Sequence, residues 1–246
     1  MSPGAGARYL EVVSQLLARM MAPGQSSAIV RAGELVAEAI ASDGLFFAFG
    51  PGHQSAVASE VAWRAGGLAP AVAMLDTGMT LLAGYRTGEA FEHLPGYGRV
   101  VFDKYQPGAS DVVALVSQSG RNPAVIDVAL AARERGCTTI AITSLAHSAA
   151  VAASHPSGKR LFELVDVVVD TGVPYGDAAI ELAGAKVGPL SVGLGLVALN
   201  AIVCEAAACL ASRGHTPPCW RSSNISGSEG HNAALVRRYA TRLRDL

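Results

Sequence analysis

The stretch that decides the fold is VVALVSQSGRNP, residues 112–123. Its first five residues are apolar, and a continuous apolar run of this length predicts a strand buried on both faces of a sheet. A polar loop, residues 117–122, follows the run, and Pro123 stands at the first position of an expected helix, where proline is well tolerated. Gly136 is placed to end that helix. The order of strand, polar loop and helix is typical of a parallel α/β sheet.

Four more apolar runs predict further buried strands, at residues 45–49, 71–75, 138–142 and 165–169. Helical patterns between the runs, at residues 55–64, 123–135 and 158–164, supply the crossovers that parallel strands require. We therefore expect an α/β fold, a three-layer αβα sandwich built on a five-stranded parallel sheet. Ligands of such sheets bind beyond the carboxyl ends of the strands, so the candidate loops follow Phe49, Leu75, Val116 and Ile142.

Two helical segments precede the first strand, at residues 9–21 and 26–40. Pro23 and Gly24 between them indicate a turn, and Ser26 or Ser27 is available to cap the second helix. We expect the two segments to form an N-terminal helical hairpin.

Residues 189–211 are apolar over a length that could span a membrane. Asn200 and Glu205 interrupt the segment, which favours a buried or dimer-interface helix. Residues 216–230, rich in Pro, Ser and Gly, precede a final helix at 229–243. We expect one domain over residues 1–246, with N-terminal helices at 1–43, the αβα core at 44–215, and a C-terminal tail and helix at 216–246.

The composition restricts the partners and the compartment. Half of the 246 residues are hydrophobic. The net charge is −1, so the chain has no general electrostatic attraction for nucleic acid or for an anionic membrane surface. We expect no nucleic-acid partner and no membrane partner. Arg8, Glu11 and Arg19 interrupt the apolar N-terminal stretch, which argues against a signal peptide and favours a cytoplasmic protein. The four cysteines form no Cys-x-x-Cys pair, and we expect them to be reduced.

The polar loop has the groups that a phosphate needs. A helix N-terminus presents unpaired backbone N–H groups and a partial positive charge. Ser117, Ser119 and Asn122 add side-chain donors, and Gly120 permits close approach of the backbone. The alternative is an ordinary turn in which Asn122 caps the helix and the serines face water.

The Ser-x-Ser-Gly-x-Asn pattern of residues 117–122 resembles the sugar isomerase (SIS) domain family. The resemblance is to an uncharacterised bacterial branch of that family. In that branch Ser and His commonly follow the Gly-His pair, whereas Gln54 and Ser55 follow it here. Further matching segments run from the first expected strand into the tail: Gly50-Pro51-Gly52-His53, Arg64-Ala65-Gly66-Gly67, Thr143-Ser144, His155-Pro156-Ser157-Gly158-Lys159, Gly176-Asp177 and Glu229-Gly230-His231-Asn232.

The resemblance implies a SIS-type, flavodoxin-like sandwich that works as a homodimer or homotetramer and binds a phosphorylated sugar. It implies no cofactor and no metal. In agreement, the sequence has no His-Glu-x-x-His, no paired Cys and no Asp-rich loop. The substrate-binding residues that we expect are Gly52, Ser55, Ser117, Gln118, Ser119, Asn122, Ser144 and His155.

Aldose–ketose isomerisation needs a base that moves a proton between C1 and C2, and usually an acid that opens the sugar ring. Glu60, on the helix after Gly52 and His53, is the expected base; a solvated carboxylate on the helix face is the alternative. His53 and His231 are the expected ring-opening groups, because imidazole titrates near neutral pH. Packed or capping histidines are the alternative for both. Glu92, beside His93, is a weaker candidate.

Three other functions compete with an isomerase. Dinucleotide binding is disfavoured, because Gly50-Pro51-Gly52 lacks the third glycine of the fingerprint, where Ser55 stands. A sensor or regulatory subunit could bind a sugar phosphate without turning it over. A related lyase, such as an etherase that cleaves the lactyl ether of N-acetylmuramic acid 6-phosphate, would use similar proton abstraction.

Overall fold

Five parallel strands form the central sheet of the protein, whose computed structural model describes residues 4–243. The strand order is β2-β1-β3-β4-β5, and every neighbouring pair is parallel. All five strands that the apolar runs predict are present, within three residues at each end. Their bounds are β1 (Phe46–Phe49), β2 (Ala71–Met74), β3 (Val112–Val116), β4 (Thr138–Thr143) and β5 (Val167–Asp170).

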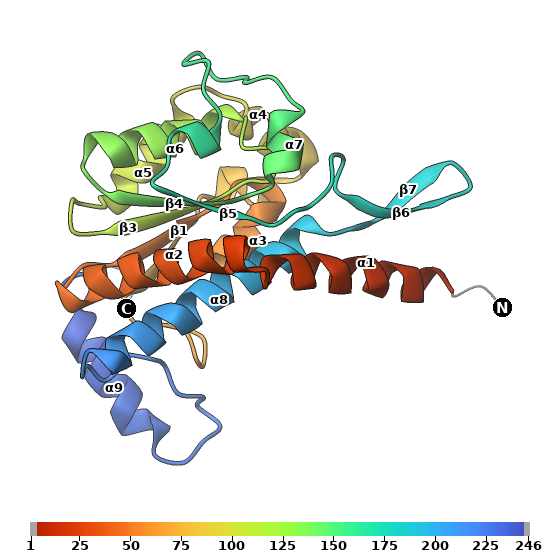
Figure 1. The fold of residues 1–246 in the computed structure, drawn as a ribbon. Coiled ribbons are helices and arrows are strands. Elements are labelled where there is room, and N and C mark those ends of the chain that lie inside the picture. Colours follow the sequence, from red (N-terminus) through yellow and green to blue (C-terminus); the bar gives the residue numbers. More distant parts are fainter. Residues whose placement is uncertain (1–3, 244–246) are drawn as a thin grey trace.

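Helices cover both faces of this sheet (Figure 1), which confirms the expected three-layer sandwich. Alternate strand residues point to opposite faces. Phe46 and Ala48 of β1 join one core cluster, with α2 (Pro23–Ala41), α3 (Ser55–Ser59) and α8 (Ser191–Ser212). Phe47 and Phe49 join the other, with α5 (Tyr97–Tyr105) and α6 (Pro123–Glu134). The strands are therefore buried on both sides, as their continuous apolar runs predict.

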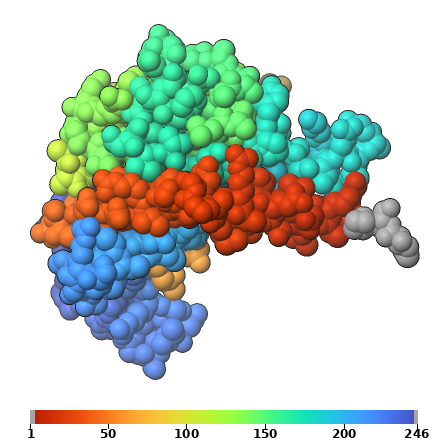
Figure 2. All heavy atoms as spheres, viewed as in Figure 1, coloured from red at the N-terminus to blue at the C-terminus, as the bar shows by residue number. Residues whose placement is uncertain are grey.

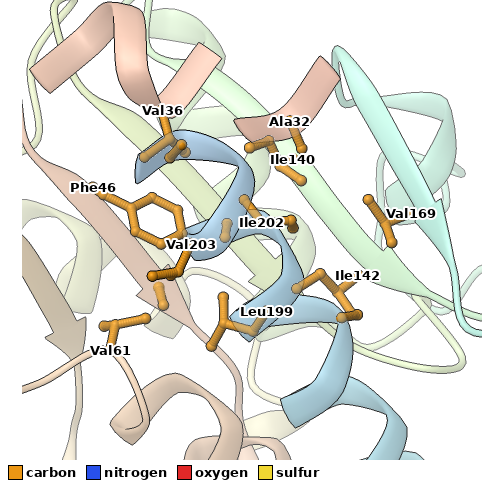
Figure 3. Close-up of a cluster of buried hydrophobic side chains, with 14 of the residues drawn as sticks. Ala32, Val36, Phe46, Val61, Ile140, Ile142, Val169, Leu199, Ile202 and Val203 are labelled. Atoms are coloured by element: carbon orange, nitrogen blue, oxygen red, sulfur yellow. The ribbon is translucent and has the colours of Figure 1, made fainter. Parts of the chain in front are cut away.

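The apolar helix α8 lies across one face of the sheet. It is long and apolar enough to cross a membrane by length and composition alone, with a mean hydropathy of 2.0. Its Leu199 and Ile202 nevertheless pack against Ile140 and Ile142 of β4 (Figure 3). The apolar side chains of α8 thus form part of the core of this fold.

The expected N-terminal hairpin is wrong in its geometry, although both helices exist. Helix α1 (Ala5–Met20) and α2 follow one another in the same general direction (Figure 1). Pro23 occupies the first turn of α2 instead of a loop, and only two residues separate the helices. The hydroxyl of Ser26 donates to the Pro23 carbonyl, and that of Ser27 to the Gly24 carbonyl, inside the first turn of α2.

Two expected helices are shorter than predicted. Helix α3 ends at Ser59, and the chain then turns at Trp63, whose φ is +54°, so that Gly66 and Gly67 can pair with Trp220. The segment 158–164 forms only a 3₁₀ turn, Leu161–Glu163. Gly158 has φ +70°, and Arg160 is extended with φ −106° and ψ 160°, so no continuous helix runs through the segment.

Several elements were not expected. The link from β2 to β3 contains α4 (Tyr85–Glu92) and α5, and α7 (Leu145–Ala149) follows β4. Strands β6 (Ala178–Leu182) and β7 (Ala185–Pro189) form an antiparallel hairpin. Together with the first turns of α1, this hairpin projects beyond the body of the molecule (Figure 2). Tyr9 joins the two by donating a hydrogen bond of 3.0 Å to the Pro189 carbonyl.

The C-terminal tail is ordered and precedes α9 (Ser228–Tyr239), as expected. Residues of the tail pair with the segment before β2: Leu68 and Cys219 form an antiparallel bridge. Leu235 and Tyr239 of α9 enter the second core cluster. The tail thus lies at the amino end of β2, which decides the place of His231 below.

Candidate functional site

A pocket of about 440 Å³ opens at the carboxyl ends of β1 and β3. This is the point where the strand order reverses direction along the chain, the usual ligand site of a doubly wound sheet. Its volume falls in the range of about 300–1,000 Å³ that is common for small-molecule sites. The lining residues are Pro51, Gly52, His53, Gln54, Glu92, Ser117, Gln118, Ser119, His147, Asp177, Pro189, Ser191 and Val192.

The loop after β3 is held in one conformation. The Ser117 N–H continues the sheet by donating to the Ile142 carbonyl, and the Ser117 hydroxyl oxygen accepts from the Gly120 N–H at 3.1 Å. Gly120 has φ +55°, and a Cβ there would lie 3.0 Å from the Cβ of Leu161. Glycine suits this position for two reasons: the φ angle is positive, and a side chain would crowd Leu161. The Ser117 hydroxyl shapes the loop, and its other lone pair and proton remain for a ligand.

Several donors of this loop have no partner among residues 4–243. The backbone N–H groups of Gln118 and Ser119 and the Ser119 hydroxyl make no hydrogen bond in the described chain. Gln118 is only 6% exposed, and its Nε2 is buried without a partner. Its Oε1 is fixed by the Thr171 hydroxyl, which donates at 2.6 Å. A buried amide without a partner is rare and marks a place where a ligand or ordered water binds.

Asn122 does not cap helix α6. It makes no side-chain capping bond, and its Nδ2 donates to Glu92 Oε1 at 2.8 Å. Glu92 is the last residue of α4 and lines the pocket; its Oε2 would lie 3.0 Å from a Cβ placed on Gly52. The structure therefore brings a carboxylate, oriented by Asn122, into the pocket. From the sequence Glu92, beside His93, is only a weaker candidate, because no motif in the long link 75–111 places it near the phosphate loop.

Two imidazoles and a glutamine complete the polar lining. His53 lies in the loop after β1, as expected, and is exposed. His147 on α7 was not anticipated; its Nδ1 is buried without a partner in the described chain. Burial lowers the pKa of His147, and the nearby Asp177 carboxylate partly opposes this, so the ring is neutral at pH 7. Gln54 Oε1 is also buried and unpartnered.

Asp177 lies between the pocket and helix α8. Its Oδ1 accepts from the N–H groups of Leu190 and Ser191 at 3.1 and 2.8 Å, and its Oδ2 accepts from the Ser191 hydroxyl at 2.7 Å. The carboxylate thus caps the start of α8 from a different segment of the chain.

Three predicted site residues lie outside the pocket. Glu60 stands beyond the end of α3, where its carboxylate pairs with Arg64 and accepts from Asn200 Nδ2 at 3.0 Å. His231 Nε2 hydrogen-bonds the Cys219 carbonyl at 2.9 Å, at the amino end of β2 and so at the opposite end of the sheet. His155 binds Asp127 at 3.1 Å through Nε2 and accepts from the Ser157 N–H through Nδ1, which anchors its loop on α6.

Three predicted residues lie beside the pocket but not in its lining: Asn122, described above, Ser144 and Ser55. Ser144 is fully buried; its hydroxyl donates to the Val173 carbonyl at 2.5 Å and accepts from the His147 N–H. Ser55 donates to the Gly52 carbonyl at 2.7 Å. Both hydroxyls hold loops that carry pocket residues.

Among residues 4–243, no group of three His, Cys, Asp or Glu side chains is arranged to hold a metal ion.

Comparison with known proteins gives matches over most of the chain. A family model for the SIS domain matches residues 8–144. A UPF0309 protein of Brucella canis is 40% identical over 214 residues, which cover 86% of this chain and 87% of the relative. A UPF0309 protein of Listeria monocytogenes is 38% identical over 221 residues, which cover 89% and 91%.

Two solved structures share the fold. A phosphoheptose isomerase from Francisella tularensis superposes with a TM-score of 0.51 at 15% identity, covering 82% of this chain and 94% of that one. The Vibrio vulnificus NanR protein complexed with ManNAc-6P gives a TM-score of 0.53 at 12% identity, covering 96% and 70%. At these identities the structures support the fold alone.

Proposed function

This chain belongs to the SIS domain family, and from that premise we propose that it binds a phosphorylated sugar in the pocket between β1 and β3. The phosphate occupies the loop 117–122 at the start of α6. The single observation that carries the proposal is the buried, unpartnered Nε2 of Gln118, beside the free N–H groups of Gln118 and Ser119. These are neutral donors on the loop that leads into the N-terminus of α6, where an anion is stabilised.

The solved relatives are consistent with this ligand class. One is described as a phosphoheptose isomerase, and the other was solved with ManNAc-6P. We carry over from them only the class of ligand, a sugar phosphate. A homo-oligomeric state and a cytoplasmic location are part of the same proposal.

The proposed reaction is aldose–ketose isomerisation, with Glu92 as the base. Its Oε1 is held by Asn122, which leaves Oε2 to take a proton from C2 of an open-chain aldose and return it to C1. His53 and the neutral His147 are the groups in the lining that can move the proton for ring opening. Glu60 and His231 are not carried forward, because their side chains are engaged outside the pocket.

Ligand binding is tested by thermal shift with hexose, heptose, amino-sugar and N-acetylamino-sugar phosphates, beside the unphosphorylated sugars. A ligand at about 100 times its Kd stabilises the fold by about 2.7 kcal/mol. For a chain of this length that corresponds to a Tm increase of roughly 5–11 °C. A shift that requires the phosphate supports the proposal, and equal shifts with and without phosphate contradict it.

Turnover is tested with Glu92→Gln, which keeps the shape of the side chain and an oxygen for Asn122. We expect kcat to fall by about 100-fold or more, as for loss of a general base, with ligand affinity nearly unchanged. The matched control is Glu89→Gln on the same helix, since Glu89 is exposed and pairs with His93. If the phosphosugar binds but neither wild type nor control turns over any member of the panel, the protein is a sensor and the isomerase proposal is wrong.

A further inference from the structure

The pocket is bounded by the N-termini of two helices. The loop 117–122 leads into α6, and Pro189, Ser191 and Val192 bring the start of the 22-residue helix α8 into the same lining. Both helix starts present backbone N–H groups and a partial positive charge, so each could attract an anionic group of a ligand. They differ in what already occupies them.

The start of α8 is occupied by the Asp177 carboxylate. Its two oxygens accept three hydrogen bonds, from the Leu190 and Ser191 N–H groups and from the Ser191 hydroxyl. Asp177 has φ +56°, a left-handed conformation that costs energy for a residue with a side chain. Its own N–H donates to the Pro174 carbonyl at 3.1 Å, which holds the turn. The carboxylate is therefore fixed in place.

The charge of the lining has one sign. Glu92 and Asp177 are its carboxylates, and none of the described lining residues is Lys or Arg. Arg121, on the phosphate loop, does not contribute to the lining. His147 adds no positive charge at neutral pH, because burial lowers its pKa. An anion at the α6 loop thus finds neutral donors beside Glu92. A second anion at the start of α8 meets the Asp177 carboxylate, with no Lys or Arg in the described lining to offset it.

We propose that Asp177 closes the α8 end of the pocket to anions, so that the site accepts sugars with one phosphate and no other charged group. This inference rests on the proposed binding of a sugar phosphate and specifies its class. Sugar bisphosphates and sugar phosphates that carry a carboxylate are rejected. The lactyl ether of N-acetylmuramic acid 6-phosphate carries such a carboxylate, so Asp177 also disfavours the etherase function that the sequence leaves open.

The test compares Kd values within pairs of ligands by isothermal titration calorimetry at pH 8. One pair is N-acetylmuramic acid 6-phosphate and its lactyl methyl ester, which have nearly the same shape and differ by one charge. The other pair is fructose 1,6-bisphosphate and fructose 6-phosphate. In the wild type we expect the more highly charged member of each pair to bind at least tenfold more weakly.

Asp177→Asn removes the charge and keeps an oxygen for the Leu190 and Ser191 N–H groups. We expect it to reduce the discrimination at least fivefold, by tightening the more highly charged ligand. The control Glu181→Gln, at an exposed position on β6 outside the lining, should leave the discrimination unchanged.

The proposal is overturned if the wild type binds a more highly charged ligand as tightly as its partner, a comparison that needs no variant. It is also overturned if Asp177→Asn folds and discriminates as the wild type does. Failure of the proposed function looks different: no sugar phosphate would bind better than its unphosphorylated sugar, and both proposals would then fall.

Discussion

Replacing Gln118 with leucine separates the stability of the protein from its ligand binding. In the free protein, the Gln118 side chain accepts one hydrogen bond, from the Thr171 hydroxyl, and its Nε2 is buried without a partner. Loss of that bond costs about 0.5–1.5 kcal/mol, whereas removal of a buried unsatisfied group recovers about 1–3 kcal/mol. Thr171 keeps a partner, because its hydroxyl can donate to the Thr143 carbonyl at 3.2 Å.

The balance predicts that Gln118→Leu stabilises the ligand-free protein by about 0.5–1.5 kcal/mol. For a chain of this length the Tm should rise by about 1–6 °C. The ligand loses a hydrogen bond to a charged oxygen, worth about 1.5–3 kcal/mol, so Kd should increase roughly 10- to 150-fold. A variant that is more stable and binds less well is the pattern expected of a residue held for function.

Calorimetric unfolding without ligand and titration with the best sugar phosphate measure the two effects. Gln15→Leu is the control, because Gln15 is on α1, away from the pocket, and bonds only the exposed Glu11. A Tm more than about 3 °C below wild type would show that the Gln118 amide is satisfied in the free protein and serves the fold. An unchanged Kd would show that the phosphate does not meet Gln118.

Two further predictions concern the fold. Burial, assisted by the Asp111 carboxylate, raises the pKa of the Cys137 thiol from 9.0 to about 11, so the folded state keeps a proton that the unfolded chain releases. The protonated Cys137 thiol contributes its full share of the unfolding free energy below pH 9, and this contribution is lost as the pH rises to 11. Urea unfolding should therefore show wild type losing about 2 kcal/mol more than Cys137→Ala between pH 9 and pH 11, and equal losses would refute the cause. Gly33→Ala would place a Cβ 2.4 Å from the Glu205 Cβ and force α2 away from α8, so we expect a loss of about 1–3 kcal/mol in thermal unfolding. Gly24→Ala, on the same helix with open space around it, is the control and should be neutral or slightly stabilising; equal effects of the two would contradict the packing argument.

Much of the fold could be predicted because the signals are local. The five strands are continuous apolar runs, and a strand buried on both faces needs nothing else. The loop 117–122 was located for the same reason: it directly follows such a run and precedes a helix start. Its small hydrogen-bond donors lie within six consecutive residues, and the structure brings Ser117, Gln118 and Ser119 into one pocket with Gly52 and His53.

The errors occurred where distant segments decide local structure. Helix α3 stops at Ser59 because the following residues must pair with the tail at Trp220, a contact between positions more than 150 apart in the chain. Glu60 therefore leaves the helix face that a continuous α3 would have given it. His231 follows the tail to the amino end of β2, which the sequence near it does not reveal.

What the sequence alone determined was the order of the strands along the chain, the burial of the sheet and the position of the polar loop 117–122, because each depends on short-range pattern. Only the tertiary structure decided which charged groups share the pocket with that loop. Glu92, His147 and Asp177 come from three separate links between strands, and no periodicity relates them. They meet because parallel strands bring all their carboxyl ends to one edge, so side chains far apart in sequence converge where the sheet reverses its order.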